Sequence, residues 1–307
     1  MSDIREIKSR MKSVSDTAKI TKAMYMISSS KMRRARAELE RTRPHFDALS
    51  SEIKRIFRSK SHIDSPYMYP ADGSHDLPGA YAYIVVTSDK GLAGFYNHAV
   101  IKEFESQMTD HESRYFMVGD YGCKYCDALG IEYDGEFRFS ADNPTMRRTR
   151  RMADYILDEY DAGKVSKIFL IYTDLENNIS QKARTVRLLP FHRKDFTDGD
   201  AMNDNVRFNF FPSAESVLNN IVRSYVAEYL YSALVDSYCC EQSARMNAMD
   251  EADRNANELM TELRLEYNHA RQGKITREIT EISAGARALK KKKMAEIAAK
   301  GANTNGR

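Results

Sequence analysis

Residues 249–263 read Met-Asp-Glu-Ala-Asp-Arg-Asn-Ala-Asn-Glu-Leu-Met-Thr-Glu-Leu, and the spacing of their apolar residues is the clearest indication of the fold. Its apolar residues recur at steps of three and four, at Met249, Ala252, Ala256, Leu259 and Leu263. A narrow apolar seam of this kind is typical of a coiled-coil helix. The seam continues in a shifted register at Ile275, Ile279, Ile282, Ala286 and Leu289.

The helix that carries this seam is predicted to be very long. No proline follows Pro212, Ser213 can cap the helix, and the next glycine is Gly273. At about 1.5 Å per residue, residues 213–289 would span about 115 Å as one helix. Such a helix needs a partner along its seam, because an isolated helix with so little apolar surface is only marginally stable.

A matching seam lies in the first 60 residues. It runs through Ile4, Ile7, Met11, Val14 and Ala18, returns at Met32, Ala35 and Leu39, and returns again at Phe46, Leu49, Ile53 and Ile56. Asp3 and Glu6 have the spacing of a capping box, and Pro44 predicts a kink or a local break. We expect the two ends of the chain to pair, although periodicity alone does not fix their direction.

Charge favours this pairing. Residues 1–60 carry 16 Lys/Arg against 7 Asp/Glu, whereas residues 213–289 carry 8 against 12, within a formal net charge of +3. Exposed ion pairs contribute only about 0–1 kcal/mol each, so apolar burial must hold the pair. The chain shows neither an apolar signal-peptide core nor an apolar run of membrane-spanning length. We expect a soluble, cytosolic protein that touches a membrane only through partners.

The middle of the chain alternates between strand and helix patterns. Strands are expected at residues 81–87, 115–118, 167–172 and 183–189, and helices at residues 97–108, 121–129 and 145–160. This alternation predicts an α/β layer with a largely parallel sheet.

Residues 88–94, Ser-Asp-Lys-Gly-Leu-Ala-Gly, follow a predicted strand and precede a predicted helix, where a phosphate-binding loop would lie. The spacing matches neither G-x-x-x-x-G-K-[ST] nor G-x-G-x-x-G, which favours a structural turn. A nucleotide-dependent α/β enzyme is the alternative. Because Ser-His-Asp and His-Glu-x-x-His patterns are absent, no catalytic or cofactor-binding residue is predicted.

Cys123-x-x-Cys126 has no second C-x-x-C and no histidine pair to complete a zinc site, so no metal is expected. Reduced thiols are favoured for this pair and for the adjacent Cys239 and Cys240. A thioredoxin-like redox motif is the alternative for Cys123 and Cys126.

Residues 271–282, Arg-Gln-Gly-Lys-Ile-Thr-Arg-Glu-Ile-Thr-Glu-Ile, resemble the C-terminal signature of the gamma subunit of rotary F-type ATP synthases, in its bacterial type. Further segments resemble the family in the expected order, at residues 19–24, 30–35, 88–94, 188–190 and 245–249. The resemblance covers residues 2–289. It implies an α/β class fold, with a long antiparallel coiled coil from the N- and C-terminal helices plus a central Rossmann-like α/β domain that binds no nucleotide.

The resemblance also divides the chain. It implies an N-terminal coiled-coil helix at residues 1–60, a central α/β domain at 61–212 and a C-terminal coiled-coil helix at 213–289 that extends beyond its mate. The lysine-rich tail at residues 290–307 departs from the family. Its four consecutive lysines are expected to prolong the helix, and residues 301–306 are expected to be disordered.

The function implied by the resemblance is that of a central rotor shaft without catalysis of its own. The shaft couples rotation of the membrane c-ring, driven by proton flow, to sequential conformational change in the hexamer of alpha and beta subunits. Epsilon and delta subunits belong to the same complex, which lies peripherally on the cytoplasmic face of the plasma (inner) membrane. No cofactor, metal or nucleic acid is implied.

The resemblance assigns partner contacts to individual residues, namely Met24, Arg245, Arg271, Gln272, Thr276 and Glu278. Met24 would lie beside the catalytic subunits, and Arg245 would meet an acidic loop of one of them. The alternatives are core filling for the methionine and an ordinary solvated helix face for the polar residues.

The main competing interpretation is a basic coiled-coil protein that binds nucleic acid. It rests on Lys31, Arg33, Arg34, Arg36, Arg41 and Arg43. Few aromatic residues interleave with that run, and the C-terminal helical segment is acidic, which argues against it.

Overall fold

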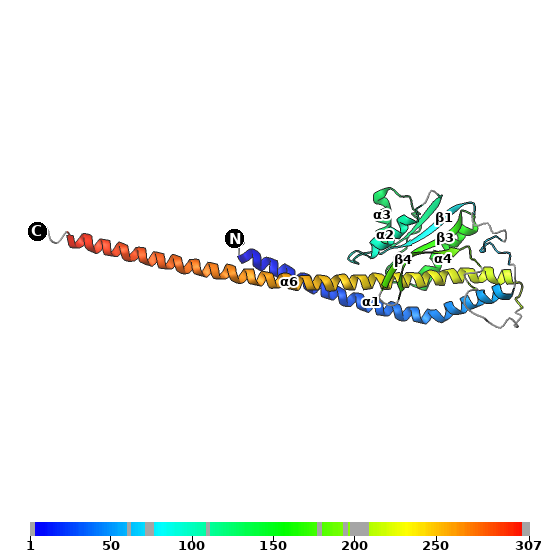
Figure 1. The fold of residues 1–307 in the computed structure, drawn as a ribbon, viewed down its shortest axis with the longest axis horizontal. Helices are drawn as coiled ribbons and strands as arrows, with labels where there is room; N and C mark the ends of the chain where they lie inside the picture. Colours follow the sequence, from blue (N-terminus) through cyan, green and yellow to red (C-terminus); the bar gives the residue numbers. More distant parts are fainter. Residues whose placement is uncertain are drawn as a thin grey trace. The chain divides into compact units, whose positions relative to one another are not determined.

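The computed structural model describes residues 4–59, 63–70, 77–108, 111–176, 180–192, 196 and 209–302. Its elements follow in the order α1 (Ile4–Ser59), β1 (Ala80–Val86), α2 (Tyr96–Ser106), β2 (Ser113–Val118), α3 (Asp120–Leu129), α4 (Met146–Asp161), β3 (Val165–Glu176), β4 (Ser180–Leu189) and α6 (Ala214–Ala302) (Figure 1). The chain forms two compact units. One comprises Met1–Ala23 and Asp250–Arg307, and the other comprises Met24–Met249. Helices α1 and α6 contribute to both.

The unit of Met24–Met249 contains a four-stranded sheet in the order β2-β1-β3-β4. β1 pairs in parallel with β2 and β3, whereas β4 pairs antiparallel with β3. β3 ends at Glu176 and β4 begins at Ser180, a separation that suits a hairpin, while parallel strands need a longer crossover. The predicted α/β layer with a largely parallel sheet is confirmed.

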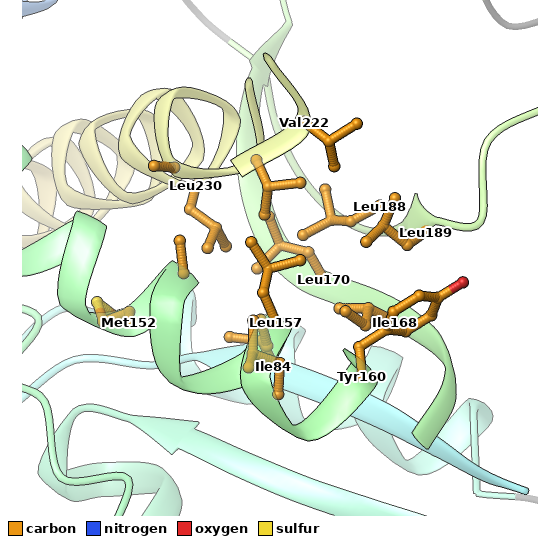
Figure 2. Packing of buried hydrophobic residues seen from close by; sticks show 14 of the residues in the cluster. Ile84, Met152, Leu157, Tyr160, Ile168, Leu170, Leu188, Leu189, Val222 and Leu230 are labelled. Carbon is orange, nitrogen blue, oxygen red and sulfur yellow. The ribbon is translucent and has the colours of Figure 1, made fainter. Parts of the chain in front are cut away.

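Side chains of β1 alternate between two apolar clusters, because successive residues of a strand point to opposite faces. Ala82, Ile84 and Val86 pack with residues of α4, α1 and α6, whereas Tyr83 and Val85 pack with residues of α2 and α3. Figure 2 shows the first cluster, in which labelled side chains of the sheet meet those of α4 and α6. The long helices are therefore part of the core of this unit.

Within the same unit, α1 and α6 pack antiparallel. Met32 of α1 packs in one cluster with Cys239 of α6. Further along α1, the ring of Phe46 stacks on the ring of Tyr225 with centroids 5.4 Å apart. Residue numbers thus rise along α1 as they fall along α6, which is the direction that the resemblance implied.

The other unit repeats this pairing independently. The Lys8 ammonium lies 5.6 Å from the centre of the Tyr267 ring. Ile4 and Ile7 line one groove together with residues of α6 as far as Glu281. Within the described residues α1 begins at Ile4, whereas α6 continues to Ala302, so α6 extends beyond its mate as expected.

The structure corrects two expectations about the long helices, one inside α1 and one at the end of α6. The local break predicted at Pro44 is wrong, since α1 runs through it without interruption. Pro44 and Glu40 are both exposed, so water can bind the Glu40 carbonyl that the proline leaves without an intrahelical donor. Disorder from residue 301 is also wrong for Gly301 and Ala302, which belong to α6, and residues 303–306 lie outside the described part.

Helices built from the described residues include none that is long and apolar enough to cross a membrane.

Candidate partner-binding surfaces

Arg245 lies on α6 and is buried, with 7% of its surface exposed. Its guanidinium pairs with Glu241 one turn earlier, at an Nη2–Oε1 distance of 2.7 Å. It also donates hydrogen bonds of 3.1 Å to the carbonyl oxygens of Lys90 and Gly91. The alternative of an ordinary solvated helix face is therefore wrong for Arg245. The guanidinium fastens the loop of residues 88–94 to α6.

The charge of the buried Glu241 carboxylate depends on Arg245 for compensation. Glu241 is 5% exposed, and burial raises the pKa of its carboxyl although Arg245 acts in the opposite direction. Burying a charge is costly unless a well-formed partner compensates it. Arg245 is the partner that makes a buried carboxylate tolerable here.

The loop of residues 88–94 is held by hydrogen bonds within the α/β layer. The Ser88 amide donates to Asn97 Oδ1 at 3.0 Å, and Asn97 Nδ2 donates to Ser88 Oγ at 2.7 Å. Asp89 accepts a hydrogen bond of 2.9 Å from the amide of Asp142. A carboxylate at this position would also repel a phosphate. The geometry favours the structural turn that the spacing predicted.

Two apolar side chains beside this turn are exposed. Leu92 is 63% exposed and has a φ of 65°, a left-handed conformation that is uncommon for leucine. Phe95, immediately before α2, is 85% exposed. Neither residue was predicted to contact a partner. The available signal was the placement of apolar residues beside Gly91 and Gly94, within a polar turn.

The four predicted contact residues nearest the C-terminus lie on one exposed stretch of α6, at Arg271, Gln272, Thr276 and Glu278. Two side-chain interactions of these residues lie within α6. Thr276 Oγ1 donates to the Gln272 carbonyl at 2.9 Å, and Lys274 Nζ lies 3.8 Å from Glu278 Oε1. The structure thus brings these residues together on one solvent-facing helix, and their contact with a partner stays a prediction.

Isoleucines interleave with those polar residues. Ile275, Ile279 and Ile282 are 45%, 59% and 72% exposed. Their helical spacing makes an apolar stripe, and contiguous exposed apolar side chains are typical of surfaces that another protein covers.

Met24 lies on α1 and is half-buried, while Tyr25, Met26 and Ile27 after it are 38%, 64% and 55% exposed. Core filling therefore does not account for this run as a whole. Met24 belongs to the unit that contains Arg245, and the other four predicted contact residues belong to the second unit.

The cysteines are free thiols with raised pKa values. Burial raises the pKa of Cys126 and Cys239 to about 11 and of Cys240 to about 12, and it also raises the pKa of the half-buried Cys123. Thiols of this kind are poor nucleophiles near neutral pH. Across the described residues, no three His, Cys, Asp or Glu side chains converge to hold a metal ion.

The chain has an antiparallel helix pair, an α/β layer packed on that pair, and an exposed apolar stripe on the longer helix. These features define a class of protein, the coiled-coil subunits that work through surfaces bound by other chains. The family model described as ATP synthase matches residues 3–289. The ATP synthase gamma chain of Ruminiclostridium cellulolyticum is 37% identical over 294 residues, which cover 94% of this chain and 99% of the relative. That of Acetivibrio thermocellus is 36% identical, covering 94% of this chain and 100% of the relative. The chain belongs to the ATP synthase gamma-chain family.

Solved structures agree with the fold. A chain of the Euglena gracilis mitochondrial ATP synthase, from the assembly with OSCP, F1 and c-ring, matches with a TM-score of 0.65 at 16% identity, covering 93% of this chain and 94% of that one. A chain of the rotor of the same enzyme matches with a TM-score of 0.62 at 17% identity, covering 89% and 98%. The alternative of a nucleic-acid-binding coiled coil finds no support in these relatives.

Proposed function

We propose that this chain is the central rotor shaft, or gamma subunit, of a proton-translocating F-type ATP synthase, and that it has no catalytic activity by itself. The observation that carries the proposal is the exposed stretch of α6 from residue 271 to residue 282, where isoleucines alternate with polar side chains. A helix with such a surface requires surrounding protein. We assign this surrounding protein to the alpha and beta subunits of the catalytic hexamer, as the family resemblance implies.

In this proposal the helix pair turns inside the hexamer, and the α/β layer joins the membrane c-ring with the epsilon subunit. The delta subunit belongs to the same complex, which lies peripherally on the cytoplasmic face of the plasma (inner) membrane. Cofactors, metals and nucleic acids have no part in it. ATP chemistry takes place in the partners.

The shaft works by differential contact energy. Because the two helices present different side chains around their circumference, each rotor position stabilises one conformation of a neighbouring subunit over the others. Arg271, Gln272, Thr276 and Glu278 suit this role, since exposed polar side chains can exchange hydrogen bonds between one rotor position and the next.

Arg245 has a second role in this proposal. Its guanidinium donates hydrogen bonds to the carbonyl oxygens of Lys90 and Gly91, so it fixes the position of the exposed Leu92 that follows them. Direct contact with an acidic loop of a catalytic subunit would require the guanidinium to exchange these carbonyls for carboxylates, which bind it more strongly.

The experiment that tests the proposal is co-expression of this chain with the alpha and beta subunits of the same genome, followed by native mass measurement and an ATPase assay. We expect one copy per hexamer and ATPase activity that depends on the chain. A free monomer that leaves the hexamer unchanged would contradict the proposal.

Met24→Lys should lower the coupling between ATP hydrolysis and proton pumping in the assembled enzyme. A charge at this half-buried position would bind partner carboxylates in some rotor positions and not in others. A difference of about 1–2 kcal/mol between positions changes their populations by about 5- to 30-fold. The measurement compares pumping in membrane vesicles with the ATPase rate, and Met24→Leu is the control that keeps an apolar side chain. Unchanged coupling in the lysine variant would refute the role of Met24.

Deletion of residues 290–307 should leave assembly and ATPase activity unchanged. The family model ends at residue 289, and residues 290–302 of the tail extend an already exposed helix. Native mass and ATPase activity of the truncated complex, compared with the full chain, check this. Loss of assembly would assign the lysine-rich tail a contact of its own.

A further inference from the structure

A groove with an excess of carboxylates lies between α1 and α6 in the unit of Met24–Met249. Its volume is about 330 Å³, and β3 and the start of α4 also line it. The charged residues of its lining are Glu40, Arg43, Asp47, Asp174, Glu228 and Asp236. We name it the acidic groove, because five carboxyl groups face one guanidinium there.

Glu228 is 6% exposed and has one unpartnered oxygen. Its Oε1 contacts Nδ1 of His45, whereas its Oε2 is buried without a hydrogen-bond partner. Among the side chains that the structure describes, Thr173 Oγ1 shares this condition, and Thr173 does not line the groove. A buried carboxylate oxygen without a donor is unfavourable. Glu228 lines the acidic groove, so a donor bound there would satisfy this oxygen once the carboxylate rotates toward it.

Asp236 is a second carboxyl of the acidic groove, and the arginines near it act through their charge and not through a hydrogen bond. Burial raises its pKa to about 6, and the charges of Arg184, Arg36 and Arg43 oppose this only in part. Arg184 is already paired with Asp174. The negative charge of the acidic groove exceeds what the cations around it compensate.

The shape of the acidic groove selects among cations. No three ligating side chains of the described residues converge as a metal ion requires. Phe46, Tyr231, Leu39 and Met146 line the same groove with aromatic and apolar surface. Such walls suit a methylene stem that carries a flat guanidinium or an ammonium group, which binds aromatic faces as well as carboxylates.

We propose that the acidic groove is a binding site for an alkyl guanidinium or alkyl ammonium group, with Glu228 and Asp236 as acceptors and with Phe46 and Tyr231 flanking the stem. Every residue that forms the site lies within the unit of Met24–Met249, so the free chain contains the complete site.

Fluorescence of the full-length chain tests the site. The sequence contains no tryptophan, so Phe46→Trp introduces a single reporter into the groove. At pH 8, Nα-acetyl-arginine amide should change the Trp emission with saturation, whereas the citrulline analogue, of the same shape without the charge, should not. Equal responses to the two compounds, or no response to either, would overturn the proposal.

Two variants separate the groove from general charge effects. Glu228→Gln should weaken arginine binding by about tenfold, because a charge-assisted hydrogen bond is lost. Glu52→Gln removes an exposed carboxylate from the same helix pair outside the groove and should leave the affinity unchanged. Equal affinity in both variants would contradict the proposal.

The unfolding temperature of Ser232 variants tests the site without the Trp reporter, and it does not require that Glu228→Gln folds. Ser232 lines the groove, so Ser232→Arg should supply the guanidinium from within and raise the unfolding temperature above that of Ser232→Gln. A lower unfolding temperature for the arginine variant would overturn the proposal.

The same reporter identifies the source of the cation. In the complex with the alpha and beta subunits, loss of the arginine response would assign the groove to an arginine or lysine side chain of a partner. A retained response would assign it to a free cation such as a polyamine. Both results keep the site, and the measurements on the free chain stand even if assembly fails.

Discussion

Arg245→Ala is expected to destabilise the protein by about 3–5 kcal/mol at pH 8, since removal of one member of a buried ion pair leaves the other as an uncompensated charge. Glu241 would be that charge, at 5% exposure, and the carbonyls of Lys90 and Gly91 would lose their donor. Urea unfolding followed by circular dichroism measures the loss. In the assembled enzyme the displaced loop should also lower coupling.

The pH dependence of this effect follows from Glu241. Burial already holds its pKa above the ordinary value, and without Arg245 the pKa rises further. A group with a raised folded-state pKa contributes stability below its unfolded pKa and loses it as the pH rises through the folded pKa. The deficit of Arg245→Ala should therefore be smaller near pH 5 than at pH 8. A deficit that does not change with pH would show that the lost hydrogen bonds, and not the stranded carboxylate, dominate.

Arg254→Ala is the matched control for this prediction. Arg254 also lies on α6 and pairs with an acid one turn earlier, Asp250, at 2.7 Å. Its side chain is 76% exposed, whereas that of Arg245 is 8% exposed. Exposed helical pairs of this kind contribute about 0.3–0.5 kcal/mol. Because residue type, spacing and helix are the same, the difference between the two variants measures burial of the ion pair together with the hydrogen bonds to Lys90 and Gly91.

Gly119→Ala should destabilise the protein by about 2–5 kcal/mol, the sum of a left-handed backbone and a steric clash. Gly119 has a φ of 89°, and a Cβ there would lie 2.4 Å from the carbonyl oxygen of Thr87 and 2.9 Å from that of Ser88. Both contacts are with backbone, which cannot rotate away as a side chain can. The clash acts on the start of the loop of residues 88–94, so this loop should shift.

Gly130→Ala separates the two causes. Gly130 has a φ of 68°, and a Cβ there would meet no atom within 4 Å. It should therefore cost only the backbone term, about 1–2 kcal/mol. Urea midpoints of the two variants measure the difference. Equal losses would mean that the contact with Thr87 relaxes without cost.

Much of the fold follows from local pattern. Three-and-four spacing predicted both long helices because a coiled-coil seam shows directly in the sequence, and the absence of proline after Pro212 predicted the length of α6. The four strands were also predicted, because buried strands form short apolar runs between turn residues. The direction of the helix pair was not in the pattern and came from the family resemblance.

The surroundings of individual side chains depend on contacts between residues that are far apart in the sequence. The sequence around Arg245 does not differ in kind from that around an exposed helical arginine. Arg245 contacts a loop that lies 154 residues earlier in the chain, and the sequence pattern does not show this contact. Just after Pro44, the ring of Phe46 stacks on that of Tyr225, a contact between α1 and α6 that the periodicity of either helix does not specify. The acidic groove brings Glu228 of α6 together with Asp174 of β3 and Asp47 of α1. Periodicity reports which face of an element is apolar, but the burial of a charge depends on what packs against it. For this reason helices and strands could be predicted from the chain alone, whereas the environments of Arg245 and Glu228 required the folded structure.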